Sequence, residues 1–289
     1  MSDVSRIVQA VEDSAPPGSV GASVPGGPSR RRWTSKILPV FTGLVIAYLM
    51  LPIFVMILYS FNQAPNSRVT FKWNGFTTEW YRNIFGLPEL TNALKVSILL
   101  ALASTVIATA LGTLIALALV RHRYRGKTAT DMVMFMNIAA PEIVLGASLL
   151  TLFVGVSVSR GFGTLLIAHV MFSIAYVTIT VRARLSGFDR SLEEAAGDLY
   201  ATPSVTFFKV TLPIIWPGVL AGGLLVFALS IDDFVISNFV NGTTITFPLW
   251  VYGAVKTGIP PQVFVMGTMI FTVGVLFAVA SLVFQRKKV

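Results

Sequence analysis

Six long apolar runs divide the chain, and each is long enough to cross a bilayer as a helix. The runs cover residues 37–61, 94–120, 132–158, 165–181, 214–235 and 263–284. About 20 mostly apolar helical residues span the hydrocarbon core of a membrane. A short stretch with glycines and one arginine, residues 157–163, separates the third run from the fourth, which indicates two helices joined by a turn. The pattern therefore predicts an all-α integral membrane protein with six transmembrane helices.

The segment before the first run has the opposite character. Residues 1–29 are rich in Pro, Gly and Ser and lack the apolar residues needed to bury a core. The first run is too long for the core of a signal peptide, so we expect it to remain as the first membrane helix. The sequence thus predicts a disordered tail over residues 1–29 and one transmembrane domain over residues 30–289.

Composition supports the membrane assignment. Charged residues make up 12% of the chain and hydrophobic residues 54%, whereas soluble domains carry about 25% charged residues. The absence of cysteine excludes thiolate metal sites, disulfides and cysteine nucleophiles. The net charge of +9 does not indicate a nucleic-acid partner, because the basic residues are scattered between apolar runs and form no basic face.

The basic residues instead indicate the orientation in the membrane. If both termini are cytoplasmic, 16 of the 22 lysines and arginines lie on the cytoplasmic side and 6 on the other side. Cytoplasmic loops of membrane proteins carry such an excess. We therefore expect the tail, the C-terminus and the long loop over residues 182–212 to be cytoplasmic.

This loop has the pattern of two short amphipathic helices. Apolar residues recur at spacings of three or four before Thr202, and Pro203 then follows a capping residue at the first position of a second helix. Two interpretations remain open at this stage. The helices rest on lipid, or they dock into a groove of a partner protein.

The residues of the loop resemble the EAA loop of ABC importer permeases. The resemblance rests on Glu193, Glu194, Ala195, Ala196, Asp198, Leu199, Thr202, Pro203, Phe208, Leu212 and Pro213, and the predicted coupling loop also includes Tyr200. It implies that the loop docks on a cytoplasmic ATPase subunit and carries the closure of that subunit to the membrane helices.

Tyr200 departs from the family, which usually has glycine at this position between the two short helices. A tyrosine with positive φ costs roughly 1 kcal/mol or more. Either the turn is built differently here, with help from Gly197, or the geometry of coupling is altered, and the conformation of the turn stays open.

Resemblance extends over residues 37–284. The runs at residues 59–62, 80–81, 141–146 and 229–237 are similar to the second permease subunit of spermidine/putrescine importers. This implies the type I importer (MetI-like) fold in the bacterial inner membrane and a polyamine cation as substrate. It also implies a second permease subunit, two ATPase subunits that bind ATP and magnesium, and an extracytoplasmic substrate-binding protein. The chain itself is expected to bind no cofactor and to catalyse no reaction.

Acidic residues within the apolar runs are candidates for the substrate path. An ionised carboxylate at the centre of a membrane helix costs roughly 2.5–3.5 kcal/mol, so such residues face a cavity or a partner. The candidates are Glu142, Asp232 and Asp233, with Asn137, Tyr176 and Ser237 as further polar groups. Adjacent helical residues point about 100° apart, so at most one of the two aspartates is expected to face a narrow path.

Other interpretations of these residues stay open. One is that the two aspartates lie in water at the outer end of a helix. Another is that Glu142 pairs with His169 or with a residue of the partner permease. His169 is expected to be a structural histidine, and no metal site is predicted. An importer of ferric iron, thiamine or another small solute is the first alternative. A stand-alone secondary transporter is less favoured, because we find no internal repeat. No phosphate-binding loop or catalytic motif indicates an enzyme.

Overall fold

The computed structural model describes residues 31–65, 68–69 and 72–286 of the chain. The predicted tail over residues 1–29 lies outside this part. Within the described residues every regular element is helical, and the pairing of Asn62 with Phe76 is an isolated bridge. The all-α prediction is confirmed.

The chain divides into two compact units, Met1–Phe54 and Val55–Val289. Helix α2 (Arg31–Ser60) begins in the first unit and ends in the second. It contains Pro39 and Pro52, and a proline inside a helix removes one backbone hydrogen bond and favours a kink. The residues Ile37–Ser60 of this helix are long and apolar enough to cross a membrane.

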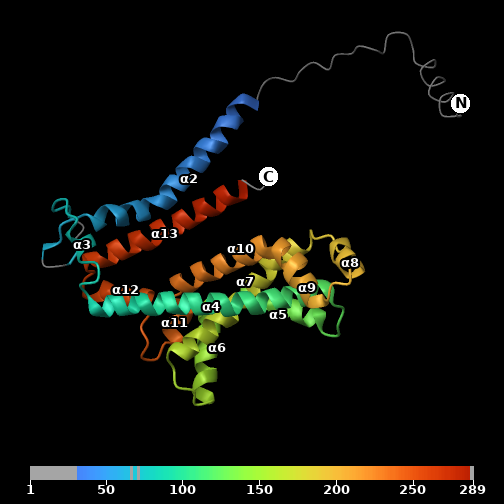
Figure 1. The fold of residues 1–289 in the computed structure, drawn as a ribbon. Helices are drawn as coiled ribbons and strands as arrows, with labels where there is room; N and C mark the ends of the chain where they lie inside the picture. The colour runs from blue at the N-terminus through green and yellow to red at the C-terminus, as the bar shows by residue number, and fades with distance from the viewer. Residues whose placement is uncertain (1–30, 66–67, 70–71, 287–289) are drawn as a thin grey trace, which may run out of the picture. The chain divides into compact units, whose positions relative to one another are not determined.

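Three long helices form the centre of the second unit (Figure 1). They are α4 (Pro88–Arg121), α7 (Phe162–Leu185) and α10 (Leu212–Asp232). A Cβ added at Gly112 of α4 would lie 2.6 Å from the Cβ of Val177 on α7. Only glycine permits this approach, and small residues are a usual means of close helix packing in membranes.

The third predicted helix is broken. Residues 132–158 do not form one helix but belong to α5 (Lys127–Ala139) and α6 (Glu142–Gly155), whose axes differ by 109°. Pro141 lacks a backbone N–H and disfavours helical geometry at Ala140, whose ψ is 134°. The apolar run was continuous, so its length concealed the bend, and the single-helix prediction is corrected.

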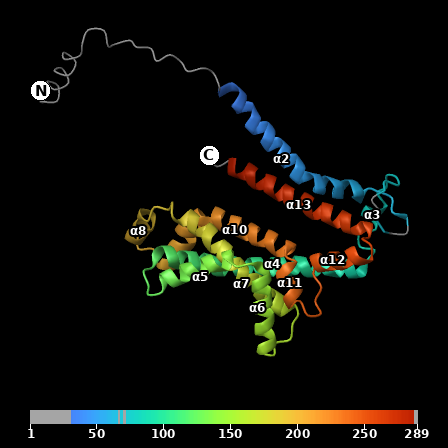
Figure 2. The same cartoon turned by 180° about the vertical axis from the view of Figure 1, so that it is seen from behind.

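The fifth predicted helix ends early. Helix α10 stops at Asp232 and the chain continues as a separate short helix, α11 (Val235–Val240). Figure 2 shows α11 beside α6, and the two helices are in contact. The prediction of one helix over residues 214–235 is corrected at its C-terminal end.

The remaining helices complete the second unit. They are α3 (Glu79–Arg82), α8 (Ser191–Asp198), α9 (Pro203–Thr206), the π-helix η2 (Phe207–Thr211), α12 (Phe247–Thr257) and α13 (Pro261–Arg286). Four helices qualify as spans, and the bent pair α5–α6 is a fifth. The stretch Pro261–Leu276 of α13 is also apolar but is shorter than these spans. The described helices are consistent with six spans.

Candidate functional site

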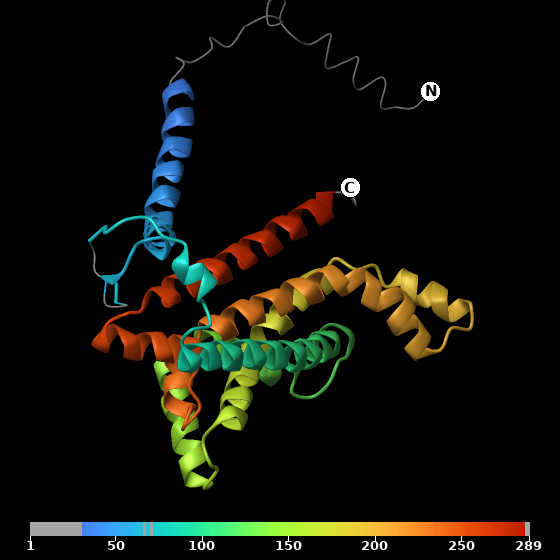
Figure 3. The same ribbon diagram turned by 60° about the vertical axis from the view of Figure 1, so that its left-hand side comes forward.

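The loop after α7 folds into α8, α9 and η2, which leads directly into α10 (Figure 3). The backbone N–H of Ser191 donates to Asp189 Oδ1 (3.0 Å) at the start of α8, and this hydrogen bond lowers the pKa of the exposed Asp189 carboxyl. Thr202 caps α9, because its hydroxyl oxygen accepts from the Val205 N–H (3.5 Å), and Pro203 follows as the first helical residue. The predicted cap is present.

Tyr200 adopts the left-handed conformation, with φ of 59°. Its N–H donates to the Gly197 carbonyl (2.9 Å), and the next N–H, of Ala201, donates to the Ala196 carbonyl (3.0 Å). This pair of bonds defines the Schellman motif, whose left-handed residue is usually glycine. The turn is therefore not built differently, because the structure has a left-handed tyrosine at the position that favours glycine.

The strained tyrosine yields a specific expectation. Tyr200→Gly and Tyr200→Asn will keep the turn closed, because both residues tolerate positive φ. Tyr200→Val will open it, because a β-branched residue is disfavoured there by about 1 kcal/mol or more, a factor of about 5 or more in the closed fraction. Limited proteolysis of the loop in the purified protein measures this fraction. Equal cleavage rates for the Gly and Val variants would contradict the left-handed geometry.

The outward surface of this segment carries several large apolar side chains. We refer to its large exposed side chains as the coupling surface: Leu192, Leu199, Tyr200, Val205 and Phe208. Leu199 is 82% exposed and Tyr200 is 97% exposed. Glu194 and Asp198 are exposed beside them. Exposed apolar groups rimmed by polar ones are typical of an interaction surface.

Glu193 lies on the inner side of α8, away from the coupling surface. Its Oε1 is 2.5 Å from Nη2 of Arg121, at the end of α4, and accepts a hydrogen bond from the Thr211 hydroxyl of η2. The guanidinium of Arg121 also lies over the Phe188 ring, 5.6 Å from its centroid. Glu193 therefore ties α8 to the helical bundle. Sequence reasoning grouped Glu193 with its neighbours and missed Arg121, which is distant in sequence and stands in a run of basic residues.

The bend between α5 and α6 carries two of the predicted path residues. Glu142 is the first residue of α6 and is exposed. In the part of the chain that the structure describes, no lysine, arginine or histidine forms an ion pair with Glu142. Asn137 lies in the last turn of α5, where its Nδ2 donates to the Met171 carbonyl (3.1 Å). The interpretation that Glu142 pairs with His169 is wrong, because the imidazole faces Asp233.

The adjacent aspartates face opposite environments. Asp232 is exposed at the end of α10. The Asp233 carboxylate turns inward, accepts from the N–H groups of Ile236 (3.3 Å) and Ser237 (2.8 Å), and lies 3.4 Å from His169 Nε2. Tyr176 of α7 is half-buried against an apolar cluster that α4, α6, α7 and α11 form together. Among the predicted path residues, the structure brings Asp233 and Ser237 into direct contact.

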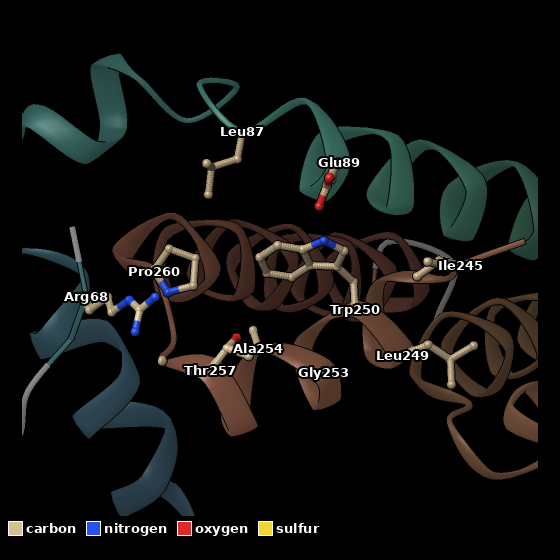
Figure 4. Close-up of a pocket in the computed structure, with 11 residues that line it drawn as sticks. Arg68, Leu87, Glu89, Ile245, Leu249, Trp250, Gly253, Ala254, Thr257 and Pro260 are labelled. Atoms are coloured by element: carbon tan, nitrogen blue, oxygen red, sulfur yellow. The ribbon is translucent and has the colours of Figure 1, made fainter. Parts of the chain in front are cut away.

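A separate pocket of about 450 Å³ lies elsewhere in the second unit. It is formed by the start of α4, helix α12 and the segments beside them, and it contains none of the predicted path residues. In Figure 4, the Glu89 carboxylate of α4 points toward the Trp250 indole of α12. Arg68 lines the same pocket, so its polar groups carry both signs of charge.

Comparison with known proteins places this geometry in a family. Residues 108–289 match the family described as "Binding-protein-dependent transport system inner membrane component". The chain is 40% identical over 248 residues to the spermidine/putrescine transport system permease protein PotC of Haemophilus influenzae, covering 86% of this chain and 95% of the relative. It is 36% identical over 252 residues to the putrescine transport system permease protein PotI of Escherichia coli, covering 84% and 89%.

A solved structure shares the fold. A chain of a bacterial ABC transporter involved in the import of the acidic polysaccharide alginate superposes with a TM-score of 0.63 at 18% identity, covering 89% of this chain and 98% of that one. At this identity the likeness concerns the fold alone. The matched family pattern and the two permease relatives show that this chain belongs to the family of inner membrane components of binding-protein-dependent transport systems.

Proposed function

We propose that this chain is the permease subunit of an ATP-driven importer that carries a polyamine cation, putrescine or spermidine. The observation that carries this proposal is the 40% and 36% identity to permeases named for these polyamines. The carboxylates of Glu142 and Asp232 add chemical support, because both are exposed on helices of otherwise apolar sequence. Carboxylates are suited to replace part of the water around ammonium groups.

The coupling surface is the proposed docking site for an ATPase subunit. Its exposed apolar groups stand on two short helices that lead without interruption through η2 into α10. Glu193, with Arg121 and Thr211, provides the rigid connection from α8 to the bundle. A movement imposed on α8 would therefore reach α4 and α10. ATP and magnesium bind to the ATPase in this scheme, and this chain binds no cofactor.

The complete importer would contain this chain, a second permease, two ATPase subunits and an extracytoplasmic substrate-binding protein. The excess of lysines and arginines in alternate loops supports insertion into the bacterial inner membrane with both termini cytoplasmic. The substrate path would include Glu142, Asp232, Asn137 and Tyr176, and the partner permease would form its other wall.

A cation importer of this kind has to be gated. Each positive charge that enters a cell gains about 2.3 kcal/mol per 100 mV of membrane potential. A permanently open acidic path would therefore leak cations inward. Coupling to ATP hydrolysis through α8 would open the path only when the binding protein delivers substrate.

The proposal is tested by uptake into proteoliposomes that contain the complete complex with ATP on the ATPase side. Labelled putrescine or spermidine is expected to accumulate only with ATP and the binding protein, and excess unlabelled polyamine is expected to compete. Competition by ferric iron or thiamine instead would identify a different substrate. Uptake driven by an ion gradient without an ATPase would contradict the importer class.

A further inference from the structure

A buried polar cluster lies where α7 meets the break between α10 and α11. Its centre is the imidazole of His169, which is fully buried. Nδ1 lies 2.7 Å from the Ser230 hydroxyl, and Nε2 lies 3.0 Å from the Ser237 hydroxyl and 3.4 Å from Asp233 Oδ2. The Ser104 hydroxyl of α4 donates to Ser230 Oγ (3.0 Å). The imidazole ring of His169 thus connects polar groups from several helices.

The partners of His169 stand on both sides of the break. Ser230 belongs to the last turn of α10, Asp233 is the residue at which the helix ends, and Ser237 belongs to α11. Asp233 leaves the helical conformation, with ψ of 118°. Polar groups without partners are costly in a low-dielectric interior, so these hydrogen bonds strongly favour one arrangement of the break.

The carboxylate of Asp233 is already engaged by groups of this chain. Oδ1 accepts from the Ile236 N–H, and Oδ2 accepts from the Ser237 N–H and faces His169. Its side chain is 6% exposed. A passing ammonium ion would have to displace these partners to reach it. Asp232 differs, since it is exposed and forms no ion pair among the described residues.

We propose that His169 and Asp233 form a latch that fixes the break between α10 and α11 and so holds Asp232 on the exposed face, where it is the aspartate that meets the cation. His169 and Asp233 are positioning residues, and Asp232 is the binding residue. The inference deepens the proposed function and depends on it for the identity of the cation. The position of the latch itself does not depend on the substrate.

The first test compares uptake of putrescine with uptake of the monoamine butylamine by the reconstituted complex. Asp232→Asn is expected to lower the preference for the diamine about tenfold, as for the loss of one charge-assisted hydrogen bond. His169→Leu is expected to lower it as well, although Asp232 remains. His169→Gln should retain it, because the Gln amide donates to Asp233 in place of Nε2–H. In the double variant His169→Leu/Asp232→Asn, the preference should fall no further than in Asp232→Asn.

A second test needs no transport and uses the absence of cysteine from the chain. Asp232→Cys should react readily with a water-soluble, charged thiol reagent, whereas Ile236→Cys, at a position that is 1% exposed on α11, should be protected. Adding His169→Leu should increase the reaction at position 236 about tenfold or more, whereas adding His169→Gln should not. Size-exclusion chromatography selects the folded samples.

The outcomes separate the latch from the substrate. If the wild-type complex fails to take up putrescine, the proposed substrate is wrong, and the thiol reaction still decides the latch. If His169→Leu lowers the maximal rate but leaves both the diamine preference and the protection at position 236 unchanged, the latch is wrong.

Discussion

Leu199→Arg is expected to abolish ATP-driven uptake while leaving the protein folded in the membrane. Leu199 is 82% exposed within the coupling surface, so the substitution removes little internal packing. Burying a leucine at an interface contributes about 1.5–3 kcal/mol, and burying an unpaired charge in its place is unfavourable. Affinity for the ATPase should therefore fall at least about tenfold, since about 1.4 kcal/mol corresponds to a factor of ten.

Co-purification with the ATPase and uptake by the reconstituted complex measure this effect. The matched control is Thr128→Arg, which adds the same charge at an exposed position of α5 outside the coupling surface. It should bind the ATPase as the wild type does. Normal uptake by the Leu199→Arg variant would show that α8 and α9 do not dock on the ATPase, and the interpretation as lipid-bound helices would then be favoured.

Glu142→Gln is expected to raise the half-saturating polyamine concentration about tenfold or more without loss of assembly. The substitution keeps the shape of the side chain and removes its charge, and a hydrogen bond to a charged group contributes about 1.5–3 kcal/mol. Glu142 begins α6 directly after the bend at Pro141 and forms no ion pair within the described residues. A diffusing cation therefore finds both oxygens without an ionic partner among the residues that the structure describes.

Initial rates of labelled putrescine uptake over a range of concentrations measure the change. Glu79→Gln is the control, because Glu79 is also an exposed glutamate in the first turn of a helix, α3, and has no proposed contact with substrate. Unchanged uptake by Glu142→Gln would reject a role in the path. Loss of the permease pair instead would identify Glu142 as a structural partner of the second permease.

Local sequence patterns predicted the features that depend on neighbouring residues. The membrane spans could be predicted from the apolar runs, because a helix needs about 20 apolar residues to cross a bilayer. The start of α9 follows from Thr202 and Pro203, because a capping hydroxyl and a proline act within one turn. The bend at Pro141 has a local signal as well, but a proline by itself does not distinguish a kink within one helix from a break between two helices.

The turn at Tyr200 shows the limit of local reasoning. The sequence identified the position as one that favours glycine, and it left the conformation of the turn open. The structure has the left-handed one, with φ of 59°. Packing and hydrogen bonds of the surrounding turn outweigh a local preference of roughly 1 kcal/mol, and that balance is not encoded in the single residue.

By itself, the sequence determined that the chain is a helical membrane protein, roughly where most of its apolar helices lie and which loop carries the family pattern. Only the tertiary structure decided that Asp233 turns inward and Asp232 outward, and that Glu193 binds Arg121 instead of standing on the coupling surface. The physical reason is common to both cases. The residues next to each carboxylate in the sequence do not show which way its side chain turns. The partners, His169 and Arg121, come from helices that are distant along the chain.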